Sequence, residues 1–225
     1  TAEDFGFYEK MGVPVPVECP QCRIQHRMSF RNFKTLYKRN SDKSGKPLVS
    51  MHRPGAPYII YSHEEWWADD WDAKTYGRDF DFNRPFFEQF AELVKVVPKS
   101  SLMNVQSESC QYSNFVMNSK NCYLVFGCIE DEDCAYGHLV WESRECFDNL
   151  YTYKSEFCYE TIDCLNCRNL SYCQECENCN DSIGLFDCRS LSNSIGCVGL
   201  TQKSYHIFNE QVTKEQYAQF LKDHP

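Results

Sequence analysis

Several features that mark common protein classes are missing from this chain of 225 residues. No apolar run approaches the roughly 20 residues of a membrane-spanning helix, and no signal-peptide pattern begins at Thr1. The sequence also lacks a Gly-rich phosphate loop, a Ser-His-Asp order and an H-E-x-x-H motif, and its 6 histidines are scattered. These absences argue against a membrane protein and against the common nucleotide-binding, hydrolase and metalloprotease classes. We therefore expect a protein that binds rather than catalyses, and we keep a solenoid enzyme as the weaker alternative.

Cysteine, by contrast, is abundant. The chain has 15 cysteines, an odd number that cannot all pair within one molecule. Together with the missing signal pattern, this count favours reduced thiols in a cytoplasmic protein, some of them bound to metal. A secreted solenoid with a ladder of disulfides is the alternative.

The charge is unevenly distributed along the chain. Residues 1–60 carry ten Lys or Arg against five Asp or Glu, a balance of +5, and the remainder has a balance of −14. A basic head on an acidic body suggests that the two parts meet different partners.

Many of the cysteines recur with a period of twelve residues. The first set is Cys110, Cys122, Cys134, Cys146 and Cys158, and a second set at half a period is Cys128, Cys164, Cys176 and Cys188. Serine stands three residues before four members of the first set, and Asp131 takes this position before Cys134. A fixed period indicates one structural unit stacked on itself. Because short runs and polar breaks alternate without helical stretches, we predict a cysteine-rich β-solenoid over residues 104–225, closed by a C-terminal helix near Thr213–Lys222.

The orientation of side chains in these runs follows from the usual period of a strand. Alternation predicts that residues 122, 124, 126 and 128 face one way, and that Cys158, Glu160, Ile162 and Cys164 do the same. Each coil could contain twelve residues or twenty-four. Twelve would give a narrow core filled by small cysteines, whereas twenty-four would give a wider β-helix.

Four later cysteines also have the spacing of a zinc site. Cys164-x-x-Cys167 and Cys176-x-x-Cys179 resemble a four-thiolate pattern. Cys164 and Cys176 also fit the twelve-residue ladder, in which buried thiols pack as small apolar groups. Packing, a second zinc site and redox chemistry therefore remain open, and packing is favoured.

The N-terminal segment contains a possible metal knuckle, Cys19-Pro20-Gln21-Cys22. Two thiolates at this spacing can bind one tetrahedral Zn²⁺, although zinc takes four ligands. His26 could be a third ligand or an ordinary surface histidine. We therefore expect Zn²⁺ at Cys19 and Cys22.

The residues around the knuckle carry a resemblance. The run from Thr1 through "E-D-F-G-F-Y-E-K-M-G" to "C-P-Q-C-R" resembles the second half of a small bacterial zinc-ribbon family. This resemblance implies a mainly β, zinc-ribbon-like segment whose other cysteine pair would lie before Thr1. Further along, "W-W-A-D-D-W-D" and "Y-G-R-D-F-D-F-N-R-P-F-F-E-Q-F" are similar to cysteine-rich repeat proteins of candidate-phylum bacteria. In those relatives a second cysteine quartet stands where this chain has Ser41, Ser44, Ser62 and Glu65, which implies a second ribbon that has kept its fold and lost its metal.

A basic stretch follows the knuckle and is interleaved with Phe30, Phe33 and Tyr37. Spacings of three and four residues would align many of its cations on one helical face. Such a face could bind the phosphate backbone of RNA or DNA, or it could be the solvated side of a helix docked through its aromatics. The candidate contacts are Arg23, Arg27, Arg31, Lys34, Lys38 and Arg39.

Residues 64–103 are expected to form an aromatic and acidic connector that ends in a helix. Pro85 suits the first turn, apolar residues follow at helical spacing, and Pro98 ends the helix. An apolar helix directly before a repeat array would cap its first coil. Asp69, Asp70, Asp72, Asp79 and Asp81 could bind a divalent cation, but pairing with Arg78 and Arg84 is favoured.

These observations give three predicted segments: a zinc-ribbon-like basic segment at 1–63, the connector at 64–103 and the solenoid at 104–225. The expected function is a non-catalytic scaffold that contacts RNA or DNA backbone through its basic segment. A scaffold with protein partners only, or a metal- or thiol-handling protein, is the alternative.

Overall fold

The computed structural model describes residues 2–224 and divides the chain after Asn32 into two compact units. The first unit contains α1 (Ala2–Met11) and α2 (Pro20–Ser29). Its described residues contain no strand, so the hairpins of a zinc ribbon are not seen there. Pro20 begins α2 at a position where its missing N–H costs nothing.

The second unit begins with two small sheets and three helical segments. Its elements up to the repeats are β1 (Tyr37–Asn40), β2 (Pro47–Ser50), β3 (Ile60–Tyr61), α3 (His63–Trp66), the 3₁₀ helix η1 (Ala73–Tyr76), α4 (Phe86–Val96) and β4 (Lys99–Ser100). β1 and β2 form an antiparallel hairpin, and β3 pairs with β4 in parallel. This second pairing joins the predicted basic segment and the connector in one sheet.

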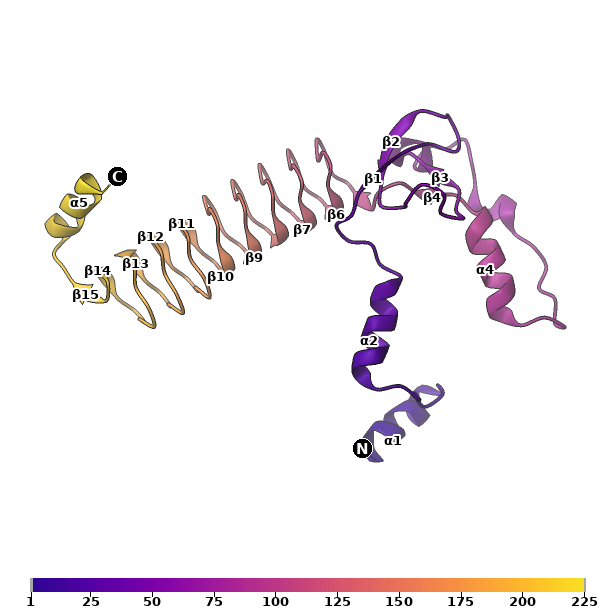
Figure 1. Cartoon of the computed structure of the whole chain (residues 1–225), viewed down its shortest axis with the longest axis horizontal. Helices are drawn as coiled ribbons and strands as arrows, with labels where there is room; N and C mark the ends of the chain where they lie inside the picture. Colours follow the sequence, from indigo (N-terminus) through magenta and orange to yellow (C-terminus); the bar gives the residue numbers. More distant parts are fainter. Residues whose placement is uncertain (1, 225) are drawn as a thin grey trace. The chain divides into compact units, whose positions relative to one another are not determined.

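The remainder is a β-solenoid of about nine turns, as predicted. Its strands in one sheet are β5 (Asn104–Val105), β6 (Asn114–Met117), β7 (Phe126–Ile129), β8 (His138–Trp141), β9 (Leu150–Tyr153) and β10 (Ile162–Leu165). A second sheet contains β11 (Arg168–Ser171), β12 (Asn180–Ile183), β13 (Ser192–Ile195), β14 (Ser204–Ile207) and β15 (Glu210–Gln211). Strands β5 to β14 pair in parallel within their sheets, and Figure 1 shows the coils following one another in a row.

Each coil contains twelve residues. Ile162 lies beside Leu150, and His138 lies beside Phe126, so that partners are always twelve positions apart. This settles the coil length that the sequence left open. The core is as narrow as a twelve-residue coil requires.

The side chains, however, follow a period of three and not two. From Ser113 to Cys197 every third residue is buried, so Cys122, Val125 and Cys128 face inward. Leu124 has a φ of 51°, and a positive φ recurs at every third position from Gln106 to Phe208. Each coil therefore has four three-residue sides, and one left-handed residue turns each corner. The predicted common face of residues 122, 124, 126 and 128 is wrong, as is that of Cys158, Glu160, Ile162 and Cys164.

Residues that precede the connector pack against the first coils of the solenoid. Phe33 stacks on Phe115 with ring centroids 5.2 Å apart, and the amide of Asn114 donates to the carbonyl of Phe33 at 3.4 Å. The α4 helix does not perform this role, because its Phe86, Phe87 and Phe90 are at least half exposed. The predicted helix is therefore present, but its phenylalanines do not cap the first coil.

The far end of the solenoid is followed by the predicted C-terminal helix, α5 (Lys214–Asp223). Thr213 and Gln216 form a capping box at its start. Tyr217 is buried, and its hydroxyl donates to the carbonyl of Asp181 at 3.3 Å. No helix within residues 2–224 is long and apolar enough to cross a membrane.

Candidate binding surfaces

The Cys19–Cys22 pair lies at the N-terminus of α2. The two sulfur atoms are 3.3 Å apart, and the N–H of Cys22 donates to the Cys19 sulfur at 3.4 Å. The N–H groups and the thiol of Cys22 lower the pKa of Cys19. His26 Nδ1 lies 3.7 Å from the Glu18 carboxylate, and among residues 2–224 no group of three or more His, Cys, Asp or Glu could hold a metal ion. The structure therefore brings Cys19 and Cys22 together without a third candidate ligand among the described residues.

The predicted nucleic-acid contacts are divided between different elements. The α2 helix ends at Ser29, so of the six candidates only Arg23 and Arg27 lie on it, and the single helical face predicted for many of them is wrong. Arg23 donates to the Tyr8 hydroxyl at 2.9 Å, whereas Arg27 is exposed. Arg31 and Lys34 are also exposed, on opposite sides of the boundary between the two units.

The last two candidates lie on β1. Lys38 is exposed, but the Arg39 side chain is only 10% exposed and pairs with Asp42 at 3.0 Å. Arg39 therefore stabilises the β1–β2 region.

Ser41, Ser44, Ser62 and Glu65 come together in the second unit as two joined turns. The Ser41 hydroxyl accepts the N–H groups of Lys43 and Ser44 at 3.1 and 3.3 Å, and it donates to the Glu65 carboxylate. The same carboxylate accepts the N–H of Ser62 at 2.9 Å. Burial opposes ionisation of Glu65, but these hydroxyl and N–H donors lower its pKa overall. One carboxylate thus joins the two turns.

Arg78 and Arg84 do pair with an acid of the connector, but this acid is a glutamate and not one of the five predicted aspartates. Both arginines pair with Glu92 on α4. Among the acids, Asp70 pairs with Lys43.

Inside the solenoid, the column that precedes the first set of cysteines is built on serine. We call Ser107, Ser119, Asp131, Ser143 and Ser155 the serine column. The Ser143 hydroxyl donates to the carbonyl of Trp141 at 2.9 Å and accepts the N–H of Ser155 at 3.1 Å. The Ser119 hydroxyl makes the corresponding pair of bonds to Met117 and Asp131. Serine therefore recurs here because its hydroxyl links each coil to the next.

The thiols are stacked in the same way. The Cys146 thiol donates to the carbonyls of Arg144 and Ser155 at 3.4 and 3.6 Å, and the buried thiols of Cys122, Cys134 and Cys158 make the corresponding pairs of bonds. Cys164, Cys167, Cys176 and Cys179 are all buried on two columns of successive coils. The neighbouring Cys167 and Cys176 thiols, together with burial, raise the pKa of Cys164. The sulfurs are thus aligned along the ladder, as the packing interpretation predicted.

Asp131 is the exception within the serine column. Its Oδ1 accepts the N–H of Ser143 at 2.9 Å, but its Oδ2 has no partner although the residue is only 2% exposed. Burial, and then the neighbouring Cys134, raises the pKa of Asp131 to about 8. The neighbouring Cys128 thiol partly opposes the rise.

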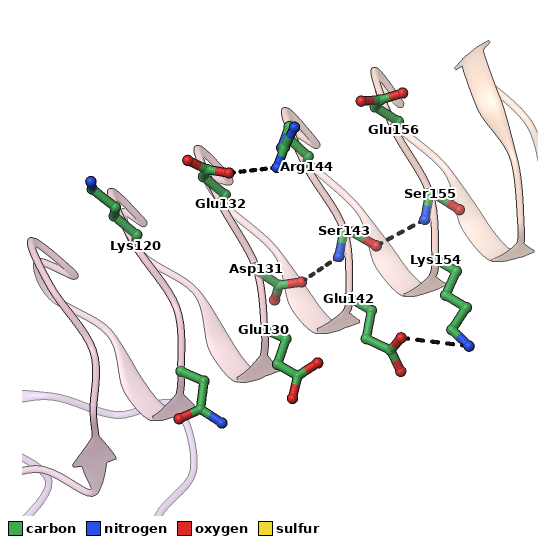
Figure 2. Close-up of a pocket in the computed structure, with 11 residues that line it drawn as sticks. Lys120, Glu130, Asp131, Glu132, Glu142, Ser143, Arg144, Lys154, Ser155 and Glu156 are labelled. Atoms are coloured by element: carbon green, nitrogen blue, oxygen red, sulfur yellow. Dashed lines mark hydrogen bonds and ion pairs between the residues drawn. The ribbon is translucent and has the colours of Figure 1, made fainter.

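The outer surface of the solenoid differs from side to side. One side carries the charged column, Glu108, Lys120, Glu132, Arg144, Glu156 and Arg168, in register from coil to coil. Its charges alternate, with Arg144 2.8 Å from Glu132 and Arg168 3.5 Å from Glu156. Figure 2 shows this column facing a second polar row, which includes Glu130, Glu142 and Lys154, across a groove floored by the serine column.

Other sides are apolar. The Met117 column consists of Met117, Ile129, Trp141, Tyr153 and Leu165, which pair in register on β6 to β10. The Tyr123 column consists of Tyr123, Ala135, Phe147 and Tyr159. Alternation also places these odd-numbered residues outside, but it does not divide the outer surface into four sides, so the sequence did not distinguish the two columns.

Comparison with protein-family models and with curated proteins finds no match for this chain. We therefore infer the function from the geometry of these surfaces.

Proposed function

We propose that this protein is a non-catalytic binding scaffold whose solenoid presents apolar columns to a protein partner. The observation that carries the proposal is the exposure of the Met117 column, in which Met117, Ile129 and Leu165 are 39–42% exposed and the two aromatic residues between Ile129 and Leu165 are partly exposed. Contiguous exposed apolar surface with a polar rim is typical of protein-binding sites. The charged column and its groove supply such a rim.

The stacking of the coils also supports a scaffold. Backbone and side-chain hydrogen bonds tie every coil to its neighbours, so the outer columns are held in place before a partner arrives. A preorganised surface loses little conformational entropy on binding. The free thiols support a reducing compartment and a cytoplasmic location as part of this proposal.

Capture of partners from nuclease-treated lysate tests the scaffold. We expect the double variant Ile129→Lys, Leu165→Lys to lose partners that the native protein retains. The matched control is Glu156→Gln, on the charged column, which we expect to retain them. If the apolar variant captures the same proteins as the native chain, the Met117 column is not the binding surface.

A second function, contact with RNA or DNA backbone, is supported by the exposed cations of the basic stretch. Arg27, Lys34 and Lys38 are exposed, and the first turn of α2 contains no acidic residue. Lysine and arginine neutralise phosphates and release counterions, so such binding weakens steeply with salt. We also propose that this segment is zinc-ribbon-like.

Salt titration of binding to single-stranded RNA tests this second function. Removing two cations, as in Arg27→Ala with Lys34→Ala, should reduce the slope of log Kobs against log salt by roughly two. Lys203→Ala, at an exposed lysine of the solenoid, is the control and should leave the slope unchanged. If the native chain does not bind RNA at low salt, this second function is wrong.

Zinc at Cys19 and Cys22 is a further part of the proposal. The sulfur separation of 3.3 Å is close to the roughly 3.8 Å that two thiolates span on tetrahedral zinc. When bound, zinc would supply a structural cross-link, and its remaining ligands would come from residues outside this pair. Metal analysis should give one zinc per chain that Cys19→Ser removes and Cys110→Ser does not. Equal zinc content in both variants would exclude the site.

A further inference from the structure

Residues 78–96, in which an irregular segment folds back along α4, expose an unusual number of phenylalanines. We call this segment the 78–96 hairpin. We call Phe80, Phe82, Phe86, Phe87 and Phe90 the phenylalanine patch. Phe82 and Phe87 are 90% and 79% exposed, and the other three are about half exposed. The rings contact one another: Phe86 lies 5.2 Å from Phe87 and stacks on Phe90 at 5.9 Å between centroids. An apolar patch of this kind on a folded protein marks an interaction surface.

The patch is held rigidly, although its rings face solvent. Gln89 is the one buried residue of α4, and its side-chain amide accepts the N–H of Asp81 at 2.9 Å. The same amide donates to the carbonyls of Asp81 and Arg84 at 2.9 and 3.0 Å. These bonds fix the segment before α4 against the helix (Figure 1). The hairpin thus presents its rings in one arrangement, which lowers the entropic cost of binding.

A small pocket opens beside the exposed rings. Its apolar lining is Phe80, Phe86, Phe90 and Leu93, and its volume is about 130 Å³. A cavity of roughly 150 Å³ lined by similar residues accommodates benzene. The pocket therefore has the size of one phenyl ring, and the most exposed rings, Phe82 and Phe87, lie against two of its walls, Phe80 and Phe86.

We propose that the phenylalanine patch is the interface of a homodimer, in which an exposed ring of each copy enters the pocket of the other. A two-fold interface uses the same surface on both copies, so it needs a protruding group and a matching recess side by side. This patch has both. Five rings of roughly 200 Å² each, exposed as above, offer on the order of 600 Å² per copy, near the roughly 800 Å² of a standard interface.

The charges near the patch are compatible with self-association. Arg78 and Arg84 both pair with Glu92 within the same hairpin. These three residues keep a net charge of +1, but the carboxylates of Asp81 and Glu88 also act on Arg84, so positive charge does not accumulate at the patch. Burial of the rings would supply most of the binding free energy.

Sedimentation velocity over a range of concentrations tests the proposal. We expect the native chain to form dimers with a micromolar dissociation constant, and the double variant Phe82→Ala, Phe87→Ala to weaken association about 30-fold, as expected for central interface residues. Phe30→Ala, at a residue that is 89% exposed in the other unit, is the matched control and should not change it. A chain that stays monomeric at about 100 times that concentration overturns the proposal. So does a monomer that instead binds lipid vesicles or another protein through the patch.

A second pair of variants separates ring-in-pocket docking from general stickiness. Leu93→Trp should fill the pocket and weaken dimerisation, although it adds apolar surface. Mixing this variant with Phe82→Ala, Phe87→Ala should partly restore dimers, because one copy keeps its rings and the other keeps its pocket. Dimerisation of Leu93→Trp as strong as that of the native chain, or a mixture that gains no dimers, contradicts the docking geometry.

Discussion

The solenoid and the two joined turns at residues 41–65 hold their polar groups in opposite ways. In the solenoid, inward hydroxyls and thiols such as those of Ser143 and Cys146 bond the next coil, and the same kind of interaction is repeated many times. In the joined turns, a single carboxylate, that of Glu65, links Ser41 to the N–H of Ser62. The first arrangement is redundant and the second depends on one residue.

This difference predicts how each region fails. Loss of one hydroxyl from a column leaves the neighbouring coils paired through their backbones. Loss of the Glu65 carboxylate leaves polar groups on two turns without partners, and unpaired buried groups cost more than hydrogen bonds contribute. Within the solenoid, we therefore expect measurable effects at the two positions that depart from the repeat. These are Cys110, which is only partly buried, and Asp131, which replaces a serine.

The largest expected effect is the difference in thiol reactivity between the edge of the solenoid and its interior. The Cys122 thiol donates to Cys110 and lowers the pKa of Cys110 to about 7, and Cys110 is only partly buried. We expect alkylation of the native protein at neutral pH to modify Cys110 about 10³-fold or more faster than the buried Cys146, which reacts only on unfolding. Peptide mass spectrometry measures both rates, with the denatured protein as control. Equal rates in the native state would contradict the buried thiol columns.

The next effect is a pH dependence of stability caused by Asp131. An aspartate in an unfolded chain ionises near pH 3.9, whereas the buried carboxyl has a pKa of about 8. Between these values the folded state binds one more proton than the unfolded state. Its stability should therefore fall by about 1.4 kcal/mol per pH unit, from a maximum below pH 4 to a plateau above pH 8.

Replacing this residue with the one typical of its column, Asp131→Ser, should remove that dependence and stabilise the protein at pH 8. Urea denaturation at several pH values measures it. Asp133→Ser, at the partly exposed aspartate two residues later, is the control and should keep the native slope. The same slope in Asp131→Ser would show that another group is responsible.

A smaller, local effect is expected at the joined turns. Glu65→Ala should destabilise residues 41–65 by about 2 kcal/mol, because Ser41 and the N–H of Ser62 lose their acceptor. Hydrogen exchange should show faster exchange in these turns and unchanged protection in the solenoid. Glu64→Ala, at the exposed neighbour, is the control. Unchanged exchange in Glu65→Ala would mean that the turns are held by packing.

The smallest effect is expected on the charged column. Arg144→Ala removes an exposed ion pair with Glu132 and should cost about 0.3–0.5 kcal/mol. Salt near 1 M should abolish the difference from the native protein in denaturation. A loss above 1 kcal/mol that persists in salt would indicate that the column does more than pair charges at the surface.

The spacings in the sequence also indicate which residues face inward in each coil, although a two-residue strand pattern does not detect this. Serine stands three positions before the first cysteine set, and the second set lies six positions away, so all these spacings are multiples of three. That common factor predicts the three-residue side. The alternation template concealed it, because it assumes extended backbone and has no place for Leu124 or Asp133 in a left-handed conformation.

Other features needed the folded chain. The α4 helix was recognised from Pro85 and its apolar spacing, but nothing local indicates whether Phe86 and Phe90 meet a coil or solvent. Phe33 and Met51 instead reach Asn114 at the first coil, over separations of 81 and 63 residues. Contacts at such separations leave no periodic trace in the sequence.

The sequence alone determined the repeat period of twelve residues and the C-terminal helix, and it favoured aligned thiols, because each follows from local spacing or capping. The tertiary structure decided which residues face inward, what covers the first coil and which phenylalanines remain exposed. These features depend on the backbone handedness of single residues and on packing between distant parts of the chain. The same amino acid can be buried in one such arrangement and exposed in another.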